Sequence, residues 1–89
     1  MVRSKVDWPD WWSWELDGSN PHLAKRMIDR GFNETDLREM LQRATGYRAD
    51  AEPGRWVIET SHDRKPWEVI VEPDAVAKLL IVVTAYAIG

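Results

Sequence analysis

Alternation of apolar and polar residues predicts four strands along the chain. Residues 12–16 alternate large apolar with polar side chains, which is the period-two pattern of a half-buried strand. Residues 55–62 and 67–72 alternate in the same way, and the polar connection 63–66 between them predicts a hairpin. Residues 79–86 are apolar on both faces, which predicts a central strand covered on at least one side.

A helical period of three and four residues replaces the alternation in the middle of the chain. Asn20 is followed by a proline at the first helical position, and Gly31 suits a left-handed stop, so a first helix is expected between them. Asn33 and Asp36 resemble a capping box that starts a second helix, and Gly46 is expected to end it. The apolar positions of the two helices are Leu23, Ala24, Met27, Ile28, Leu37, Met40, Leu41 and Ala44.

The predicted order of elements is strand, helix, helix, strand, strand, strand. Residues 47–54, between the second helix and the hairpin, are expected to form a loop. Two helices with one apolar face each are expected to cover one face of a four-stranded, mainly antiparallel sheet, which makes an α+β fold. The first strand is expected either at a sheet edge or beside the last strand. A length of 89 residues fits a single domain over 1–89, with residues 1–10 as an irregular segment.

Composition narrows the classes of protein and of site. The chain is 44% hydrophobic and 30% charged, which is typical of a soluble globular domain. It has no cysteine and two histidines, so disulfides and thiolate chemistry are excluded, and neither a metal nor a cofactor is expected. The longest apolar run is too short for a bilayer and no signal peptide opens the chain, so we expect a cytoplasmic protein without membrane contact. The net charge of −3 means that any RNA site must be a local patch.

The first candidate for chemistry is a stripe on the first predicted helix. His22, Arg26 and Arg30 are four residues apart, so they lie near one line on the helix surface. An imidazole can move a proton near neutral pH, and guanidinium groups bind phosphate oxygens in pairs, so the stripe suits an anionic substrate. The alternative is a solvated helix face on which Asp29 and Glu34 pair the arginines.

The second candidate is the predicted hairpin connection. It carries a titratable group, two cations and an aromatic ring, namely His62, Arg64, Lys65 and Trp67. RNA sites combine cations for the phosphates with rings for the bases, so these residues are candidates for substrate binding. The alternative is an ordinary charged hairpin tip.

The third candidate is the end of the last predicted strand. Thr84 and Tyr86 point to the same side of that strand and can donate to a phosphate or position a ribose hydroxyl. The alternative is that they complete a strand face. Glu59, Glu68 and Glu72 are each plausible as a general base, but their spacing indicates no carboxylate pair. No phosphate loop, serine elbow or metal motif is present.

Four of the six tryptophans lie within residues 8–14. Trp12 and Trp14 are expected to pack in the core or on the sheet, whereas Trp8 and Trp11 are expected on the surface. Exposed apolar residues usually mark a contact with a partner or with a second copy, so a homodimer is one expectation. The acidic neighbours argue against RNA at this segment; they are Asp7, Asp10, Glu15 and Asp17.

The order of several short motifs resembles a bacterial family known as domain of unknown function 4258. The motifs are a histidine-started helix followed by Arg-Gly-Phe at 30–32, a pair of strands at 54–57 and 66–71, and a Thr-x-Tyr ending at 84–86. The resemblance covers about residues 20–87.

That family is in turn similar to small bacterial toxins and ribonucleases, including RelE-type toxins, barnase and the colicin D nuclease domain. The resemblance implies helices packed on an antiparallel sheet, metal-independent cleavage of RNA, and an antitoxin or other protein partner. Carried over by position, His22 is the acid/base candidate, and Arg26 and Arg30 are phosphate ligands. Thr84 and Tyr86 contribute from the sheet. The alternative is a non-catalytic interaction module that uses the tryptophan-rich segment.

Overall fold

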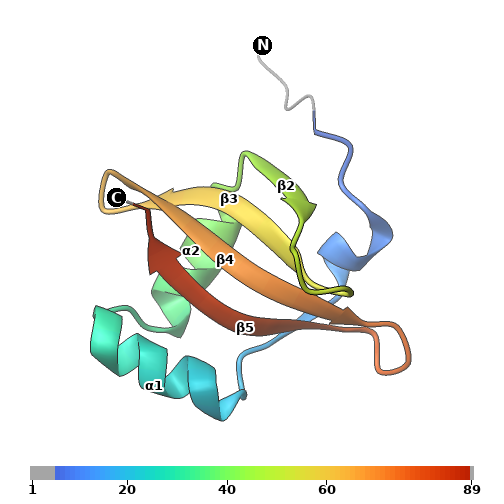
Figure 1. Ribbon diagram of the computed structural model, residues 1–89, viewed down its shortest axis with the longest axis horizontal. Coiled ribbons are helices and arrows are strands. Elements are labelled where there is room, and N and C mark those ends of the chain that lie inside the picture. The colour runs from blue at the N-terminus through green and yellow to red at the C-terminus, as the bar shows by residue number, and fades with distance from the viewer. Residues whose placement is uncertain (1–5, 89) are drawn as a thin grey trace.

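The first helix begins and ends where its capping residues place it. In the computed structural model, which describes residues 6–88, helix α1 spans Pro21–Arg30 (Figure 1). The backbone N–H of His22 donates to the Asn20 side chain at 2.9 Å, which satisfies one free donor of the first turn. Gly31 closes the helix in the left-handed conformation, at a φ of 67°. The predicted start and stop of this helix are both confirmed.

The second helix also starts as predicted, but it ends earlier. Helix α2 spans Glu34–Gln42. Asn33 and Asp36 form a reciprocal capping box, each side chain accepting from the other residue's backbone N–H. The prediction that Gly46 ends this helix is wrong. The helix stops before Arg43, and Gly46 opens a strand.

Within residues 6–88, five strands form one mixed sheet in the order β1-β5-β4-β3-β2. They are β1 Glu15–Asp17, β2 Gly46–Ala49, β3 Trp56–His62, β4 Lys65–Asp74 and β5 Leu79–Ala87. The prediction of four strands is therefore wrong by one, and part of the expected loop 47–54 is the strand β2. This strand pairs antiparallel with β3, whose outer N–H and C=O groups would otherwise lack partners.

The first strand is shorter than predicted and parallel to its neighbour. Residues 10–13 form a 3₁₀ turn instead of starting a strand, and β1 covers three residues only. It pairs parallel with residues 79–81 of β5, so it lies both at a sheet edge and beside the last strand. A parallel neighbour needs a long crossover, and the two helices with strands β2–β4 supply it. The other three strand pairs are antiparallel, as expected.

One hydrophobic core lies between the helices and the sheet. It joins side chains from both helices to alternate residues of the long strands, including Leu23, Leu37, Met40, Ile58, Val69, Val71, Val82 and Ala85. Helix α2 packs against β3, and α1 packs against β5, along the edge of the sheet (Figure 1). Because α1 lies at the edge, it buries only a narrow stripe. The predicted core residues Ala24 and Ile28 are exposed, Ile28 to 83%.

A β-bulge decides which face of the sheet the end of β5 presents. Ile70 pairs with Thr84, whereas Val71 pairs with Val82, so one extra residue is inserted in β5. Val82 and Ala85 therefore both face the core. Side chains alternate along a strand, so Thr84 and Tyr86 lie on the opposite, outer face. Without the bulge they would share the core face of Val82.

Candidate functional site

A cavity of about 580 Å³ lies at one end of the sheet. Three segments meet there: the last turn of α1, the turn between β3 and β4, and the end of β5 (Figure 1). The lining residues are Arg30, Gly31, His62, Asp63, Lys65, Trp67, Tyr86 and Ala87. The cavity therefore brings together five of the residues that the sequence singled out from three separate motifs: Arg30, His62, Lys65, Trp67 and Tyr86.

Arg30 is held at the edge of the cavity by β5. Its Nη1 atom donates to the Thr84 hydroxyl at 3.1 Å and to the Ala85 carbonyl at 2.9 Å. β1 pairs only with residues 79–81 of β5, so in the described part of the chain the Ala85 carbonyl has no neighbouring strand on that side. Arg30 supplies the hydrogen-bond donor that such a strand would supply. Within residues 6–88, Arg30 forms no ion pair with a carboxylate. Its charge is thus fixed in place and available to an anion.

The turn between β3 and β4 presents His62 and Lys65 to the same cavity. Asp63 and Arg64 both adopt positive φ angles, 53° and 63°, which is typical of a two-residue hairpin turn. His62 and Lys65 are therefore a directly opposed pair. Asp63 adds one carboxylate to a wall that otherwise carries two cations.

Trp67 supports the imidazole from the core side. Its ring is 7% exposed and contacts the Phe32 ring edge-on, at 5.5 Å between centroids. The His62 ring stands edge-on against it at 5.3 Å. A buried ring offers little surface for stacking a base, so the contact that Trp67 makes in this cavity is with His62.

Tyr86 belongs to a hydrogen-bond network on the outer face of the sheet. Its hydroxyl donates to Oε1 of Glu68 at 2.8 Å, and Nη2 of Arg48 donates to Oε2 of Glu68 at 2.7 Å. Nη1 of Arg48 bonds to Oε2 of Glu59 at 2.8 Å. The hydrogen bond from Arg48 is the largest cause that lowers the pKa of Glu68, and burial followed by the bond to Glu68 raises the pKa of Tyr86. At neutral pH the pair is therefore a carboxylate and a neutral phenol.

The pairing of Glu59 with Glu68 was not predicted from the sequence. The signal for it was the hairpin turn. Counting back from a two-residue turn at 63–64 pairs residue 62 with 65 and places Glu59 opposite Glu68, as the structure has them. Arg48 carried no such signal, because its strand was predicted to be a loop.

Two predicted residues of the helix stripe lie outside the cavity. His22 is exposed in the first turn of α1, and Arg26 pairs with Asp29 at 3.7 Å. A rise of about 1.5 Å per residue puts His22 roughly 12 Å from Arg30 along the helix axis. Glu34 pairs with Arg38 at 3.7 Å rather than with Arg30. The stripe thus divides into an exposed start and an end that faces the cavity.

Arg64 and Thr84 lie next to the cavity without lining it. Thr84 accepts the hydrogen bond from Arg30 described above. Arg64 lines an adjoining cavity of about 680 Å³, which shares His62 and Asp63 with the first. Arg43 also lines this second cavity and donates to the Ser61 carbonyl at 3.0 Å. The second cavity therefore has two cations beside two carboxylates, Glu39 and Asp63.

The tryptophan-rich segment packs largely against itself and β2. Trp8 stacks on Trp12 at 4.0 Å between ring centroids and on Tyr47 at 5.3 Å. Trp11 contacts the rings of Trp12, Tyr47 and Trp56 at 6.2, 5.8 and 5.7 Å. We refer to these five rings as the aromatic cluster. Trp8 and Trp11, predicted as partner contacts, are half-buried within it.

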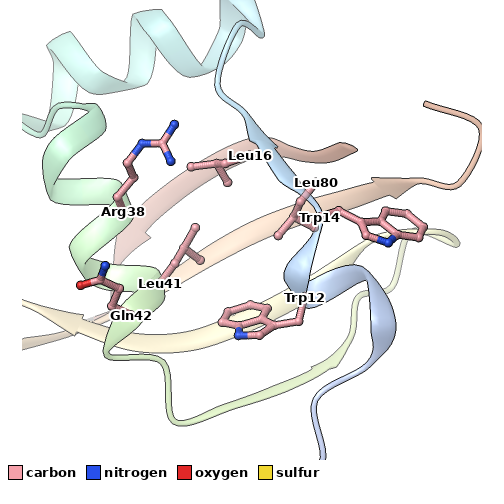
Figure 2. A pocket seen from close by; sticks show the side chains of 7 residues that line it. All are labelled: Trp12, Trp14, Leu16, Arg38, Leu41, Gln42 and Leu80. Atoms are coloured by element: carbon pink, nitrogen blue, oxygen red, sulfur yellow. The ribbon is translucent and has the colours of Figure 1, made fainter. Parts of the chain in front are cut away.

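A smaller groove of about 270 Å³ opens between this segment and α2. Figure 2 shows Trp12, Trp14 and Leu16 along one side and the side chains of α2 along the other. Its floor is apolar, with Leu41 and Leu80, and Arg38 supplies a cation at its rim.

The described part of the chain contains neither a metal cluster nor a membrane-spanning helix. Residues 6–88 contain no group of three or more His, Asp or Glu side chains arranged to hold a metal ion. Within the same residues, neither helix has the length and the hydropathy needed to cross a bilayer.

Comparisons with known proteins identify the family of the chain. No curated protein and no solved structure matches it. A family model does match, over residues 20–87. These residues run from the cap of α1 to the end of β5, so they include every residue that lines the cavity and leave out the tryptophan-rich segment. The chain belongs to the family described as "Domain of unknown function (DUF4258)".

Proposed function

We propose that the protein is a metal-independent RNA endonuclease whose site is the cavity between α1 and the β3–β4 turn. One observation carries the proposal: four polar groups, from three segments far apart in the chain, line one cavity. They are Arg30, His62, Lys65 and Tyr86. A cavity with convergent polar groups of complementary chemistry is the usual form of a binding or active site.

Three of these groups, His62, Arg30 and Lys65, have roles in cleavage of the RNA backbone. The ribose 2′-oxygen attacks the adjacent phosphorus, the bond to the 5′-oxygen breaks, and the products are a 2′,3′-cyclic phosphate and a 5′-hydroxyl. One proton leaves the 2′-oxygen and one reaches the 5′-oxygen, and His62 is the group in the cavity suited to move a proton near neutral pH. Arg30 and Lys65 stabilise the negative charge that builds on the phosphate oxygens.

His62 takes the role that the family resemblance assigned to His22. His22 is exposed and lines no cavity with the other groups, whereas His62 lines the same cavity as Arg30, Lys65 and Tyr86. Proton transfer requires a heavy-atom separation of about 3 Å in the reacting complex, so groups that act together must share one cleft.

We further propose that the protein is a toxin whose activity a partner protein inhibits. The support is the resemblance to RelE-type toxins together with two helices that precede an antiparallel set of strands. Fold alone does not establish activity, so this part depends on a cellular test. Induced expression is expected to arrest growth, and the variant His62→Ala is expected to remove the arrest at equal protein levels.

The direct test is cleavage of an RNA substrate by purified protein in EDTA, with and without ribosomes. We expect fragments with cyclic phosphate and 5′-hydroxyl ends from the wild-type protein. The variant His62→Ala should lower the rate by roughly 10²- to 10⁴-fold. Lys25→Ala is the matched control, because Lys25 is an exposed cation on α1 outside the cavity.

The variant His22→Ala separates the two histidines. If cleavage is lost in His22→Ala and kept in His62→Ala, the chemistry lies on the exposed start of α1 and not in the cavity. If the folded wild-type protein cleaves no RNA under either condition, the nuclease proposal fails.

The groove in Figure 2 favours a second candidate, a non-catalytic interaction module. Its occupant would be a partner segment with an apolar side chain, because the floor of the groove is apolar and Arg38 at its rim is already paired with Glu34. Folded protein without nuclease activity, and a partner whose binding is lost in Leu41→Glu, would favour this function over the first.

A further inference from the structure

We infer that Tyr86 accepts a hydrogen bond from the ligand in the cavity, and that it therefore selects a sugar hydroxyl, the ribose 2′-hydroxyl of RNA. The nature of the ligand rests on the proposed function. The direction of the hydrogen bond rests on the contacts of Glu68 alone.

Glu68 occupies the only hydrogen of the Tyr86 hydroxyl. The Glu68 side chain is 13% exposed, and its two oxygens have separate partners: Oε2 accepts from Arg48 and Oε1 accepts from Tyr86. An ionised carboxylate has no hydrogen to donate, and a guanidinium has no acceptor. The direction of both bonds is thereby fixed, with Tyr86 as the donor to Glu68.

The phenol oxygen keeps acceptor capacity after donating its hydrogen. Tyr86 lines the cavity, so a ligand group that meets this oxygen there must itself be a donor. Phosphate oxygens do not donate at neutral pH, and they are suited instead to Arg30 and Lys65 in the same cavity. A ribose 2′-hydroxyl does donate, and DNA lacks it, so this contact distinguishes RNA from DNA.

A single substitution should reverse the direction of the bond. In Glu68→Gln, Arg48 still presents only donors, so the amide oxygen is expected to face Arg48 and the amide NH₂ to face Tyr86. Tyr86 then accepts from Gln and turns its own hydrogen toward the cavity. The variant keeps the size of the side chain and the shape of the cavity but presents a donor in place of an acceptor.

The test compares the binding of three oligonucleotides of one sequence: RNA, DNA and RNA with 2′-fluoro sugars. The 2′-fluoro form keeps the RNA-like sugar shape without a hydroxyl donor. Affinities are measured by fluorescence anisotropy in the His62→Ala background, and a gel confirms that the RNA stays intact. RNA is expected to bind about three- to ten-fold more tightly than either analogue, the range of one hydrogen bond.

Three variants then locate the source of this preference. Glu68→Gln and Tyr86→Phe should each bring the RNA and 2′-fluoro affinities to within about two-fold of one another. Glu59→Gln is the matched control, because Glu59 also contacts Arg48 but not Tyr86, and it should keep the preference. Thermal unfolding of each variant verifies that it is folded, and Tyr86→Phe still tests the inference if Glu68→Gln does not fold.

The outcomes distinguish this inference from the proposed function. The inference is overturned if all three oligonucleotides bind equally to the His62→Ala protein, or if adding Glu68→Gln keeps the preference for RNA. Phosphate binding in the cavity stands in either case. If no oligonucleotide binds and no RNA is cleaved, the proposed function and this inference fall together.

Discussion

The two ends of strand β3 carry chemically opposite regions. Trp56 at its start belongs to the aromatic cluster, and His62 at its end lines the cavity. Trp56 and His62 are six positions apart along the strand, which corresponds to roughly 20 Å between their backbones. At the first end apolar rings contact other rings of the same chain. At the second end two cations of the described structure, Arg30 and Lys65, have no carboxylate partner.

This difference shows what an unusual composition does and does not indicate. Six tryptophans suggest a partner surface, yet Trp8 and Trp11 make contacts that stabilise the fold itself. A pair of aromatic rings in such contacts contributes about 0.5–1.5 kcal/mol beyond its burial. Charged groups without carboxylate partners contribute little to stability, and the proposed function assigns them to a ligand. The following predictions test this contrast, from the largest expected effect to the smallest.

Replacing Arg30 by alanine should have a large effect on activity and a small effect on stability. Loss of a donor that stabilises the transition state should lower RNA cleavage by on the order of 10²- to 10³-fold. Loss of its hydrogen bonds to Thr84 and Ala85 should cost about 1 kcal/mol of unfolding free energy. Cleavage rates and urea unfolding measure the two effects separately. Arg26→Ala on the same helix is the comparison, and an equal loss in that variant would contradict the contrast.

Replacing Trp11 by alanine should have a large effect on stability and none on activity. The substitution removes contacts with three rings of the aromatic cluster, so it should lower the unfolding free energy by about 2–4 kcal/mol. The cleavage rate of the folded fraction should not change, because the ring lies far from the cavity. Trp11→Phe should recover part of the stability. A loss of cleavage at full stability would show that the two regions are coupled.

Replacing Lys65 by alanine should weaken RNA binding about three- to ten-fold and change its salt dependence. A lysine that neutralises one phosphate contributes about 0.7–0.9 to the slope of log affinity against log salt, so the slope should fall by about that amount. Titrations at several salt concentrations measure it. The matched control is Lys78→Ala, since Lys78 lies over the Trp14 ring, outside the cavity. An unchanged slope in Lys65→Ala would remove Lys65 from the phosphate contacts.

The smallest effect concerns the pH dependence of stability. Arg48 holds the pKa of Glu68 below its ordinary value, so the folded protein binds fewer protons at Glu68 than the unfolded chain does. This contribution to stability is complete above the unfolded value, about 4.3, and is lost as the pH falls through the lower folded pKa. Because Arg48 is half exposed, the contribution should be under about 1 kcal/mol. Urea unfolding of wild-type protein and Glu68→Gln should converge in acid, and a difference that is constant with pH would contradict this account.

Local signals predicted the helices and the hairpin well. The Asn20 cap and the Gly31 stop bound α1, and the Asn33–Asp36 box starts α2, because each is a contact within four residues of chain. The hairpin is confirmed, but its predicted connection over 63–66 is too long by two residues: the turn is 63–64, and β4 begins at Lys65 beside His62. The family resemblance proposed from short motifs is confirmed over residues 20–87.

Other features had no local signal. Strand β2 has no clear alternation and exists because β3 offers it an edge, so it was predicted to be a loop. The bulge in β5 depends on packing against β4, and it alone places Tyr86 on the outer face beside Glu68. The division of the helix stripe into an exposed His22 and a bound Arg30 follows from where α1 meets β5.

The chain by itself therefore specifies its caps, its hairpin turn, its apolar stripes and its family, since these depend on neighbouring residues. Tertiary structure decides which polar residues meet. Arg30, His62 and Tyr86 come from segments more than twenty residues apart, and their convergence depends on the order of the strands, the bulge and the docking of α1 at a sheet edge. Each of these is set by the burial of one shared core, which no local pattern contains.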